Sequence, residues 1–353
     1  MATTGGRRLA RRAFLAGAAG LAGAVALGGA GSAAAAPRAW PARAARQGSG
    51  QLKIGYIPLL TVGPLFLAAD RGYFRDAGLD VDMVRFNSGA EMVVGLGTGE
   101  LTAGFAGASP GLFNAWARGV RTVFVADGAR SAPGHENTLV VVRSDLADEI
   151  RDPRDLRGRR VGLSVVGSVI DYMMRNLLEQ HGMSLDDIEV VRLASADVNA
   201  GLAGRTLDVA GVGEPFGTMA EQLGVARRWL TIEQIVPGME VAGIAVSQAA
   251  LADRAQVVAL VTAYLRGVRD FLPGQNSDPD VIEVINRWSG VQPDIIRRAA
   301  PAYMDPNGRM DVDDVRRQQA FWLREGVIDR TVPIDDRFDF SYAEAALQTL
   351  GRA

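Results

Sequence analysis

Two stretches of similar pattern decide the fold: SGAEMVVGLGTGELTAGFAGASPG, residues 88–111, and SADVNAGLAGRTLDVAGVGEPFG, residues 195–217. Each has a serine, a nearby acid, a Gly-Leu pair, a leucine that opens a short apolar strand and a glycine that closes it. A proline follows the closing glycine, at Pro110 and at Pro215. Chance likeness of two β-α units is one explanation, but two halves built on one plan is the better one. It places Ser109 and Glu214 at equivalent edges of two sheets.

Strands and helices alternate on both sides of these stretches. An apolar run from Lys53 and an alternating run from Leu79 predict strands, and the segment between them predicts a helix. Beyond Leu251 the pattern is mostly helical, with amphipathic segments over 252–272 and 312–325. This order favours parallel α/β layers. Ligands of open α/β sheets bind beyond the carboxyl ends of strands, where helices begin, so two facing edges predict a cleft.

The first 36 residues have the pattern of a targeting signal and are not expected to be part of the fold. They carry four arginines and no acid, and Arg11-Arg12 precedes Phe14-Leu15 and an Ala/Gly-rich run that ends in small residues. This pattern is typical of a cleaved signal peptide and resembles the twin-arginine type. A membrane anchor is the alternative. We expect residues 37–51 to be a disordered lead-in and the mature chain to be periplasmic or on the cell surface.

Composition excludes several function classes. The formal net charge is −2, and no basic stretch interleaves with aromatic residues, so nucleic acid is not an expected partner. The absence of cysteine excludes disulfides, thiolate metal sites and cysteine nucleophiles. The only histidines, His135 and His181, are too far apart in sequence for a local metal-binding motif. We therefore expect no metal and no cofactor.

Three motifs point to chemistry that their details do not support. Gly107 to Gly111 fits the nucleophile elbow, but Pro110 has no N–H for the oxyanion hole, so Ser109 is better explained as a helix N-cap. The glycines around Glu214 miss the spacing of a dinucleotide loop, and the acid would repel a pyrophosphate. Residues 305–314 lack the spacing and closing glutamate of a calcium loop. We therefore do not expect an enzyme.

Taken in order, several pieces of the chain resemble one family. They are KIGYIP, LFLAADRGYFRDAGLDVDMVRF, GLGTGELTAGFAG, TLVVVRSDL, DVAGVGEPF and MDPNGRMDVDDVRRQQAFWLREGVID. The chain resembles the substrate-binding proteins of ABC importers, in the branch that covers nitrate, taurine, alkanesulfonates and thiamine-pyrimidine precursors. The resemblance implies a two-lobed periplasmic binding protein fold of type II, in which each lobe is a sheet flanked by helices. Lobe 1 would comprise residues 52–138 and 243–353, with a helical C-terminal extension, and lobe 2 residues 139–242. Two crossing segments, around 138–141 and 242–245, would form the hinge.

The resemblance also implies a ligand site between the lobes. Serine hydroxyls and helix N–H groups would hold ligand oxygens, and Phe216 would pack against an apolar part of the ligand. Glu214 would accept hydrogen bonds from the ligand or steady a neighbouring arginine. Helix capping explains three of these residues as well as ligand contact does: Thr61, Asn87 and Ser88. The full set is Leu60, Thr61, Asn87, Ser88, Ala108, Ser109, Asp127, Gly167, Ser168, Glu214 and Phe216.

The implied function is capture of a small organic molecule and its delivery to a permease with its ATPase, by a monomer outside the cytoplasm. The first loop, IPLLTVGPLF, has no tryptophan or histidine and departs from the better-known members. Its apolar character indicates a larger or more hydrophobic ligand. Two alternatives remain. One is an exported enzyme on the same fold, related to thiamine-pyrimidine synthesis. The other is a sensor subunit that presents its ligand to a membrane receptor.

Overall fold

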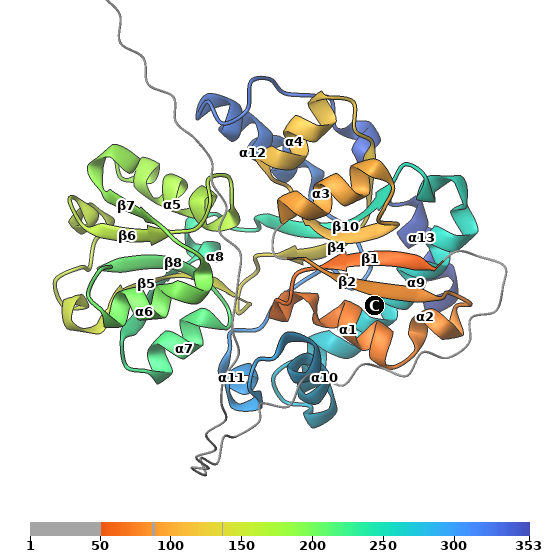
Figure 1. The fold of residues 1–353 in the computed structure, drawn as a ribbon, viewed down its shortest axis with the longest axis horizontal. Coiled ribbons are helices and arrows are strands. Elements are labelled where there is room, and N and C mark those ends of the chain that lie inside the picture. Colours follow the sequence, from red (N-terminus) through yellow and green to blue (C-terminus); the bar gives the residue numbers. More distant parts are fainter. Residues whose placement is uncertain (1–50, 87–88, 136) are drawn as a thin grey trace, which may run out of the picture. The chain divides into compact units, whose positions relative to one another are not determined.

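The computed structural model describes residues 51–86, 89–135 and 137–353. The predicted signal peptide and most of the lead-in lie outside this range, as do Asn87 and Ser88. The described chain forms two five-stranded sheets, which we call sheet A and sheet B (Figure 1). Sheet A contains β1 (Leu52–Tyr56), β2 (Val81–Arg85), β3 (Ala103–Gly107), β4 (Thr122–Arg130) and β10 (Glu240–Ser247). Sheet B contains β5 (Thr138–Arg143), β6 (Arg160–Leu163), β7 (Glu189–Arg192), β8 (Val209–Gly213) and β9 (Ala226–Thr231).

The two sheets have the same strand order. Sheet A runs β2-β1-β3-β10-β4 and sheet B runs β7-β6-β8-β5-β9. β3 and β8, the strands of the two similar sequence stretches, therefore occupy the same central position. The prediction of two sheets built on one plan, each flanked by helices, is confirmed.

The sheets are mixed, whereas the strand–helix alternation predicted parallel layers. β10 pairs antiparallel with both β3 and β4, and β5 pairs antiparallel with both β8 and β9. The reason is topological, because these are the strands by which the chain enters each sheet from the other one. The chain crosses from β4 to β5 between Arg130 and Thr138, and returns through 232–239 to β10. Residues 138–141 and 242–245, predicted as the hinge, lie inside β5 and β10.

Side chains alternate along the strands and join different cores on the two faces of sheet A. Phe105 and Ile244 belong to a core formed with α1, α9 and α10, while Ala106 and Ala245 belong to a core formed with α3, α4 and α12. Figure 1 shows α1 and α9 on one side of this sheet and α3 and α4 on the other. Because successive side chains of a strand point to opposite faces, a sheet covered on both faces needs apolar or small residues at nearly every strand position.

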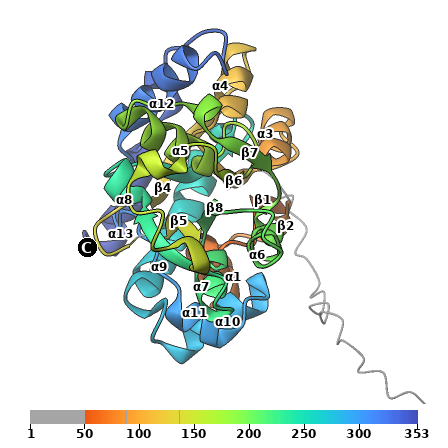
Figure 2. The same cartoon turned by 90° about the vertical axis from the view of Figure 1, so that its left-hand side faces the viewer.

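The helices around sheet A are α1 (Gly63–Asp70), α2 (Tyr73–Asp76), α3 (Gly89–Thr98), α4 (Pro110–Ala117), α9 (Arg254–Gly274), α10 (Pro279–Ser289) and α13 (Ser341–Leu350). Those around sheet B are α5 (Val169–Gln180), α6 (Val198–Ala203), α7 (Phe216–Gln222) and α8 (Ile232–Ile235). α11 (Pro293–Arg298) and α12 (Val312–Arg324) touch both groups. α12 reaches α5, where the Tyr172 and Phe321 rings meet edge to face at 4.6 Å, and α11 contacts α7 (Figure 2).

Candidate ligand-binding site between the sheets

The first candidate element is the start of α4, directly after β3. Ser109 is the N-cap, and its Oγ accepts a hydrogen bond from the Leu112 N–H at 3.4 Å. Pro110 occupies the first helical position, where its missing N–H costs no hydrogen bond. Ala108 and Ser109 are both half-buried. A capped helix therefore begins at the carboxyl end of a central strand, as the sequence predicts.

The second element is the start of α5, after β6 of sheet B. Ser168 caps this helix, because its Oγ accepts from the Asp171 N–H at 3.1 Å and also lies 2.7 Å from Ser164 Oγ. Gly167 has φ +80°, a left-handed conformation that glycine adopts without strain. Its N–H donates to Asp171 Oδ2 at 3.2 Å, and Asp171 is fully buried and paired with Arg175 at 3.1 Å. These contacts hold the loop before α5 in one conformation.

The two helix starts meet. A Cβ atom added to Gly167 would lie 2.7 Å from Pro110 Cγ, so the backbone of the α5 loop packs against the first residue of α4. This contact brings together four of the predicted residues from the two halves of the fold. Two follow β3 of sheet A, Ala108 and Ser109, and two follow β6 of sheet B, Gly167 and Ser168. Helix N-termini carry partial positive charge and free N–H groups, which attract ligand oxygens. Beside them the same loop exposes two valines, Val165 at 74% and Val166 at 54%.

The remaining candidates of sheet A lie after β1 and within β4, where Asp127 was expected to follow the strand. Leu60 is buried and Thr61 half-buried on a short 3-10 helix, Leu60–Val62, that links β1 to α1. Asp127 on β4 is fully buried, and its Oδ2 accepts from the Asp305 N–H at 2.6 Å. Burial raises the pKa of Asp127 to about 7, although Asp305 N–H and Arg130 act in the opposite direction. One carboxylate oxygen of Asp127 is therefore committed to a backbone N–H of this protein.

Glu214 follows β8, and a cis peptide bond joins it to Pro215. Its side chain is 1% exposed and bonded on both oxygens. Oε2 accepts from the Thr218 N–H at 3.1 Å. Oε1 accepts from Arg228 Nη2 at 2.5 Å and from the Ala300 N–H at 3.1 Å. The Arg228 contact corresponds to the second of the two roles considered for Glu214, that of steadying an arginine.

Phe216 opens α7 and is half-buried. Its ring packs against the core that lies between sheet B and helices α6 and α7, and its carbonyl accepts from Asn199 Nδ2 at 3.2 Å. The predicted residues therefore fall into separate groups. The starts of α4 and α5 meet, Glu214 turns to the segment after α11, and Asp127 turns to residues 303–308.

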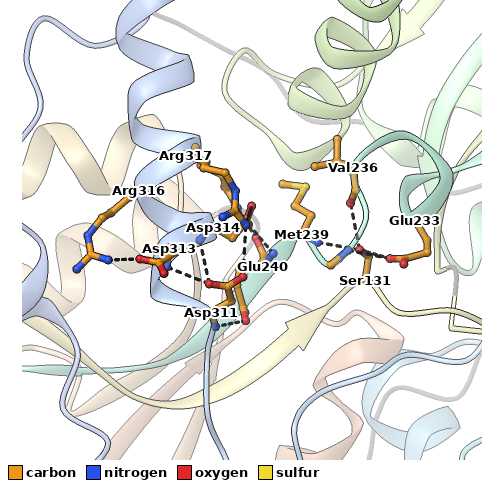
Figure 3. A network of polar contacts seen from close by, with 12 residues as sticks. Ser131, Glu233, Val236, Met239, Glu240, Asp311, Asp313, Asp314, Arg316 and Arg317 are labelled. Carbon is orange, nitrogen blue, oxygen red and sulfur yellow. Dashed lines mark hydrogen bonds and ion pairs between the residues drawn. The ribbon is translucent and has the colours of Figure 1, made fainter.

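A polar network at the crossing segments is absent from the sequence-based prediction (Figure 3). Ser131, just after β4, donates to Glu233 Oε2 at 2.7 Å and accepts from the Met239 N–H at 2.9 Å, so it ties the two crossing segments together. Glu240 then accepts from the Asp311 N–H at 2.5 Å, and Asp314 accepts from the Glu240 N–H at 2.8 Å. The only sequence signal for Glu240 is a single acid at the start of the apolar run EVAGIAVS.

Two surface cavities lie elsewhere and involve none of the predicted residues. One of about 370 Å³ is lined by Arg316, Gln319 and residues 331–335. The other, of about 430 Å³, is lined by Arg130, Asp305, Phe340 and residues 309–313. Across the residues that the structure describes, no group of three or more His, Asp or Glu side chains is arranged to hold a metal ion. Within that same part of the chain, none of the helices has the length and apolarity needed to span a bilayer.

Comparison with known proteins assigns the family. A family model described as NMT1/THI5 like matches residues 61–276, which is more than half of the chain. The chain belongs to the NMT1/THI5-like family. Among solved structures, the alkanesulfonate-binding protein SsuA from Xanthomonas axonopodis pv. citri, bound to MOPS, is similar with a TM-score of 0.67. The alignment has 22% identity and covers 82% of this chain and 98% of that one, so it shows a shared fold.

Curated relatives match over a shorter range. The taurine-binding periplasmic protein of Escherichia coli (strain K12) is 28% identical over 156 residues, which is 44% of this chain and 46% of that protein. The 4-amino-5-hydroxymethyl-2-methylpyrimidine phosphate synthase of Aspergillus parasiticus is 27% identical over 147 residues, or 39% of this chain and 41% of that protein. The chain thus matches less than half the length of these relatives. This chain therefore has the fold of periplasmic binding proteins. Its curated relatives include both binding proteins and a synthase.

Proposed function

We propose that this chain is the solute-binding component of an ABC importer, which holds a small organic molecule between sheets A and B. The contact between the starts of α4 and α5 carries this proposal, because it joins two capped helix N-termini from different sheets. Their N–H groups and the hydroxyls of Ser109 and Ser168 suit the oxygens of an anionic or polar group. The relatives named above for alkanesulfonate and taurine agree with a ligand that carries such a group.

The proposed ligand also has an apolar part. Val165 and Val166 are exposed beside the start of α5, and the loop after β1 brings Ile57 and Leu59, both half-buried, to the carboxyl end of its strand. Exposed apolar groups next to a polar-group site favour a ligand with a hydrophobic body. In the proposed complex, a permease and an ATPase receive the ligand from a monomeric binding protein. We propose export by the twin-arginine route to the periplasm or cell surface.

The synthase relative supports an enzyme as the second candidate. Against it, Lys53, the only lysine, is the second residue of β1, at the strand end opposite to the one where ligands bind. The two histidines each place Nδ1 beside a backbone carbonyl, His135 at 3.1 Å from Pro133 O and His181 at 2.8 Å from Leu177 O. None of these three side chains lies at the start of α4 or α5. We therefore favour binding without turnover.

A thermal-shift screen tests the proposal. The panel contains alkanesulfonates, taurine, nitrate, aminopyrimidines, aromatic acids and flavins, each with the wild type and with a Ser109→Ala, Ser168→Ala double variant. A ligand at about 100 times its dissociation constant stabilises the folded state by about 2.7 kcal/mol. We expect one class to shift the wild type and to shift the double variant less. No shift with any class, together with turnover of a pyrimidine substrate, would contradict the binding proposal and favour the enzyme.

A further inference from the structure

One face of α7 lies along α11 and the residues after it. Three side chains spaced four residues apart make this contact: Glu214, which lies just before α7, and Thr218 and Gln222, which lie on it. The Ala300 N–H donates to Glu214 Oε1 at 3.1 Å, and Gln222 Nε2 donates to Asp294 Oδ2 at 3.0 Å. Between them, the Thr218 hydroxyl lies 3.1 Å from Glu214 Oε1 and 3.5 Å from Arg298 O. We call this set the α7–α11 stripe.

The stripe joins the two halves of the molecule. α7 packs on β8 and β9 of sheet B, whereas α11 packs on α10, which in turn contacts α1 and α9 beside sheet A. Both views of the fold place α7 next to α11 (Figures 1 and 2). Any rotation of sheet B relative to sheet A about the crossing segments therefore moves the two sides of the stripe relative to each other.

The two ends of the stripe differ in burial and in distance from the crossing segments. Glu214 is buried, and its N–H donates to Asn137 O at 2.8 Å, one residue before β5 begins. Thr218 is also buried. Gln222 and Asp294, at the other end, are both exposed. The Glu214 end therefore sits close to the crossing segment and moves little in a hinge rotation, while Gln222, the last residue of α7, lies farther out.

We propose that the α7–α11 stripe is a closure contact: Glu214 fixes its inner end, and the Gln222–Asp294 hydrogen bond breaks when the sheets separate. This proposal rests on the proposed function, since it assumes that ligand binding is coupled to hinge closure. Gln222 and Asp294 act at a distance from the starts of α4 and α5. They set the fraction of closed molecules, and the apparent affinity for any ligand follows that fraction.

The chain offers a clean way to measure closure, because it contains no cysteine. Asp186→Cys, beside β7 of sheet B, and Glu283→Cys, on α10, place two spin labels at exposed positions on opposite sides of the stripe. Pulsed dipolar spectroscopy then gives the distribution of distances between the labels without any ligand. We expect Gln222→Ala and Asp294→Ala each to add a longer-distance population, with the closed-to-open ratio reduced roughly two- to fivefold.

Glu221→Ala is the matched control. Glu221 is the neighbour of Gln222 on α7, and its carboxylate accepts from Arg228 Nε at 2.7 Å. We expect Arg228 to keep its bonds to Glu214 and Thr218 in this variant, because they use its Nη2 and not the Nε that Glu221 binds. We expect the label distances of this variant to equal those of the labelled parent. The double variant Gln222→Ala, Asp294→Ala should match either single variant, because both remove the same hydrogen bond. The free energy of unfolding in urea should fall by no more than a fivefold loss of the closed population allows, which is about 1 kcal/mol, so a larger loss would indicate damage to the fold and not opening alone.

Two results would overturn the closure contact. In one, the distance distributions of the Gln222 and Asp294 variants equal that of Glu221→Ala. In the other, the double variant shows the summed effect of the two single changes. Because the labels report without ligand, a screen that finds no ligand leaves this measurement intact and counts against the proposed function alone. Ligand binding in a protein whose labels do not respond to Gln222→Ala counts against the closure contact alone.

Discussion

Glutamine in place of Glu240 tests whether a buried carboxyl group at the crossing segments is protonated at neutral pH. Glu240 is fully buried at the start of β10, and its Oε2 has no hydrogen-bond partner among the described residues. Burial, together with the charges of Asp127 on β4 and Asp314 on α12, raises the pKa of Glu240 to about 9. The Asp311 N–H and Arg130 oppose this rise without cancelling it. These are the groups that face the carboxyl from β4, from the start of α12 and from the segment before α12.

The sign and size of the effect follow from proton linkage. An unfolded chain releases the Glu240 proton near the ordinary pKa of 4.5, whereas the folded protein keeps it up to about pH 9. Between these values unfolding releases a proton, so the free energy of unfolding falls as pH rises, by at most about 1.4 kcal/mol per pH unit. From pH 4.5 to pH 7.5 this amounts to about 4 kcal/mol. Glutamine carries no ionisable proton, and its carbonyl oxygen can still accept from the Asp311 N–H.

We expect Glu240→Gln to match the wild type in stability near pH 5 and to exceed it at pH 8, by about 2–4 kcal/mol. Urea unfolding followed by circular dichroism at pH 5, 6.5 and 8 measures this difference. Glu344→Gln is the control, because Glu344 is about half exposed in an ion pair with Arg352. Parallel pH profiles for wild type and Glu240→Gln would show that Glu240 is ionised in the folded state and would refute the reasoning.

Two further substitutions probe other buried acids. Glu214→Ala should lower the free energy of unfolding, measured by urea titration, by about 3 kcal/mol. The reason is that it leaves Thr218 N–H, Ala300 N–H and Arg228 without their acceptor. A loss as small as that of Glu221→Ala would contradict this prediction. Arg160 and Arg143 lower the pKa of Asp208 to about 2 against the opposing effect of burial. The unfolded chain binds that proton near pH 3.8, so stability present at neutral pH is lost as pH falls toward 2. We therefore expect Asp208→Asn to be less stable than the wild type by about 2 kcal/mol at pH 7. Its free energy of unfolding should also fall less steeply than that of the wild type between pH 4 and pH 2. An equally steep fall in both proteins would contradict this prediction.

Local pattern was enough to predict the strands and helices that repeat within each half. β3 and β8 are short apolar runs closed by glycine, and the structure puts them at the same position of two sheets. Ser109 and Ser168 were predictable as helix starts because an N-cap serine has a local physical cause, the unpaired N–H groups of the first helical turn. Their meeting across the two sheets could not be read from local pattern, since it depends on how the sheets pack.

Local pattern could not predict the antiparallel direction of β5 and β10, nor the polar network at the crossing segments. β5 and β10 have the same apolar composition as parallel strands, and only the path of the chain between the sheets sets their direction. Ser131, Glu233 and Glu240 are single polar residues in otherwise unremarkable segments. Their partners lie up to about a hundred residues away, so no spacing rule brings them together. Whether the predicted ligand residues contact a ligand stays a prediction.

The buried acids of this protein share one structural task. Asp127 accepts from Asp305 N–H, Glu240 from Asp311 N–H, Asp314 from Glu240 N–H and Glu214 from Ala300 N–H. Three of these N–H groups belong to segments beside the sheets, and the fourth belongs to Glu240, the first residue of β10, where the β10–β4 pairing is irregular. Backbone donors without a regular ladder still need acceptors when buried, and a carboxylate is an acceptor with two oxygens.

This task changes how an acid at a strand end should be interpreted. The sequence shows Asp127 and Glu214 at the carboxyl ends of strands, which is also where ligand-binding acids occur. In the structure, oxygens of both carboxylates are already used by backbone N–H groups of the crossing or adjacent segments. The hydroxyls of the two N-cap serines have only local bonds, a capping bond for Ser109 and a capping bond plus the contact with Ser164 Oγ for Ser168. Ligand affinity should therefore respond directly to the serines, and to the acids only through the geometry of the crossing segments.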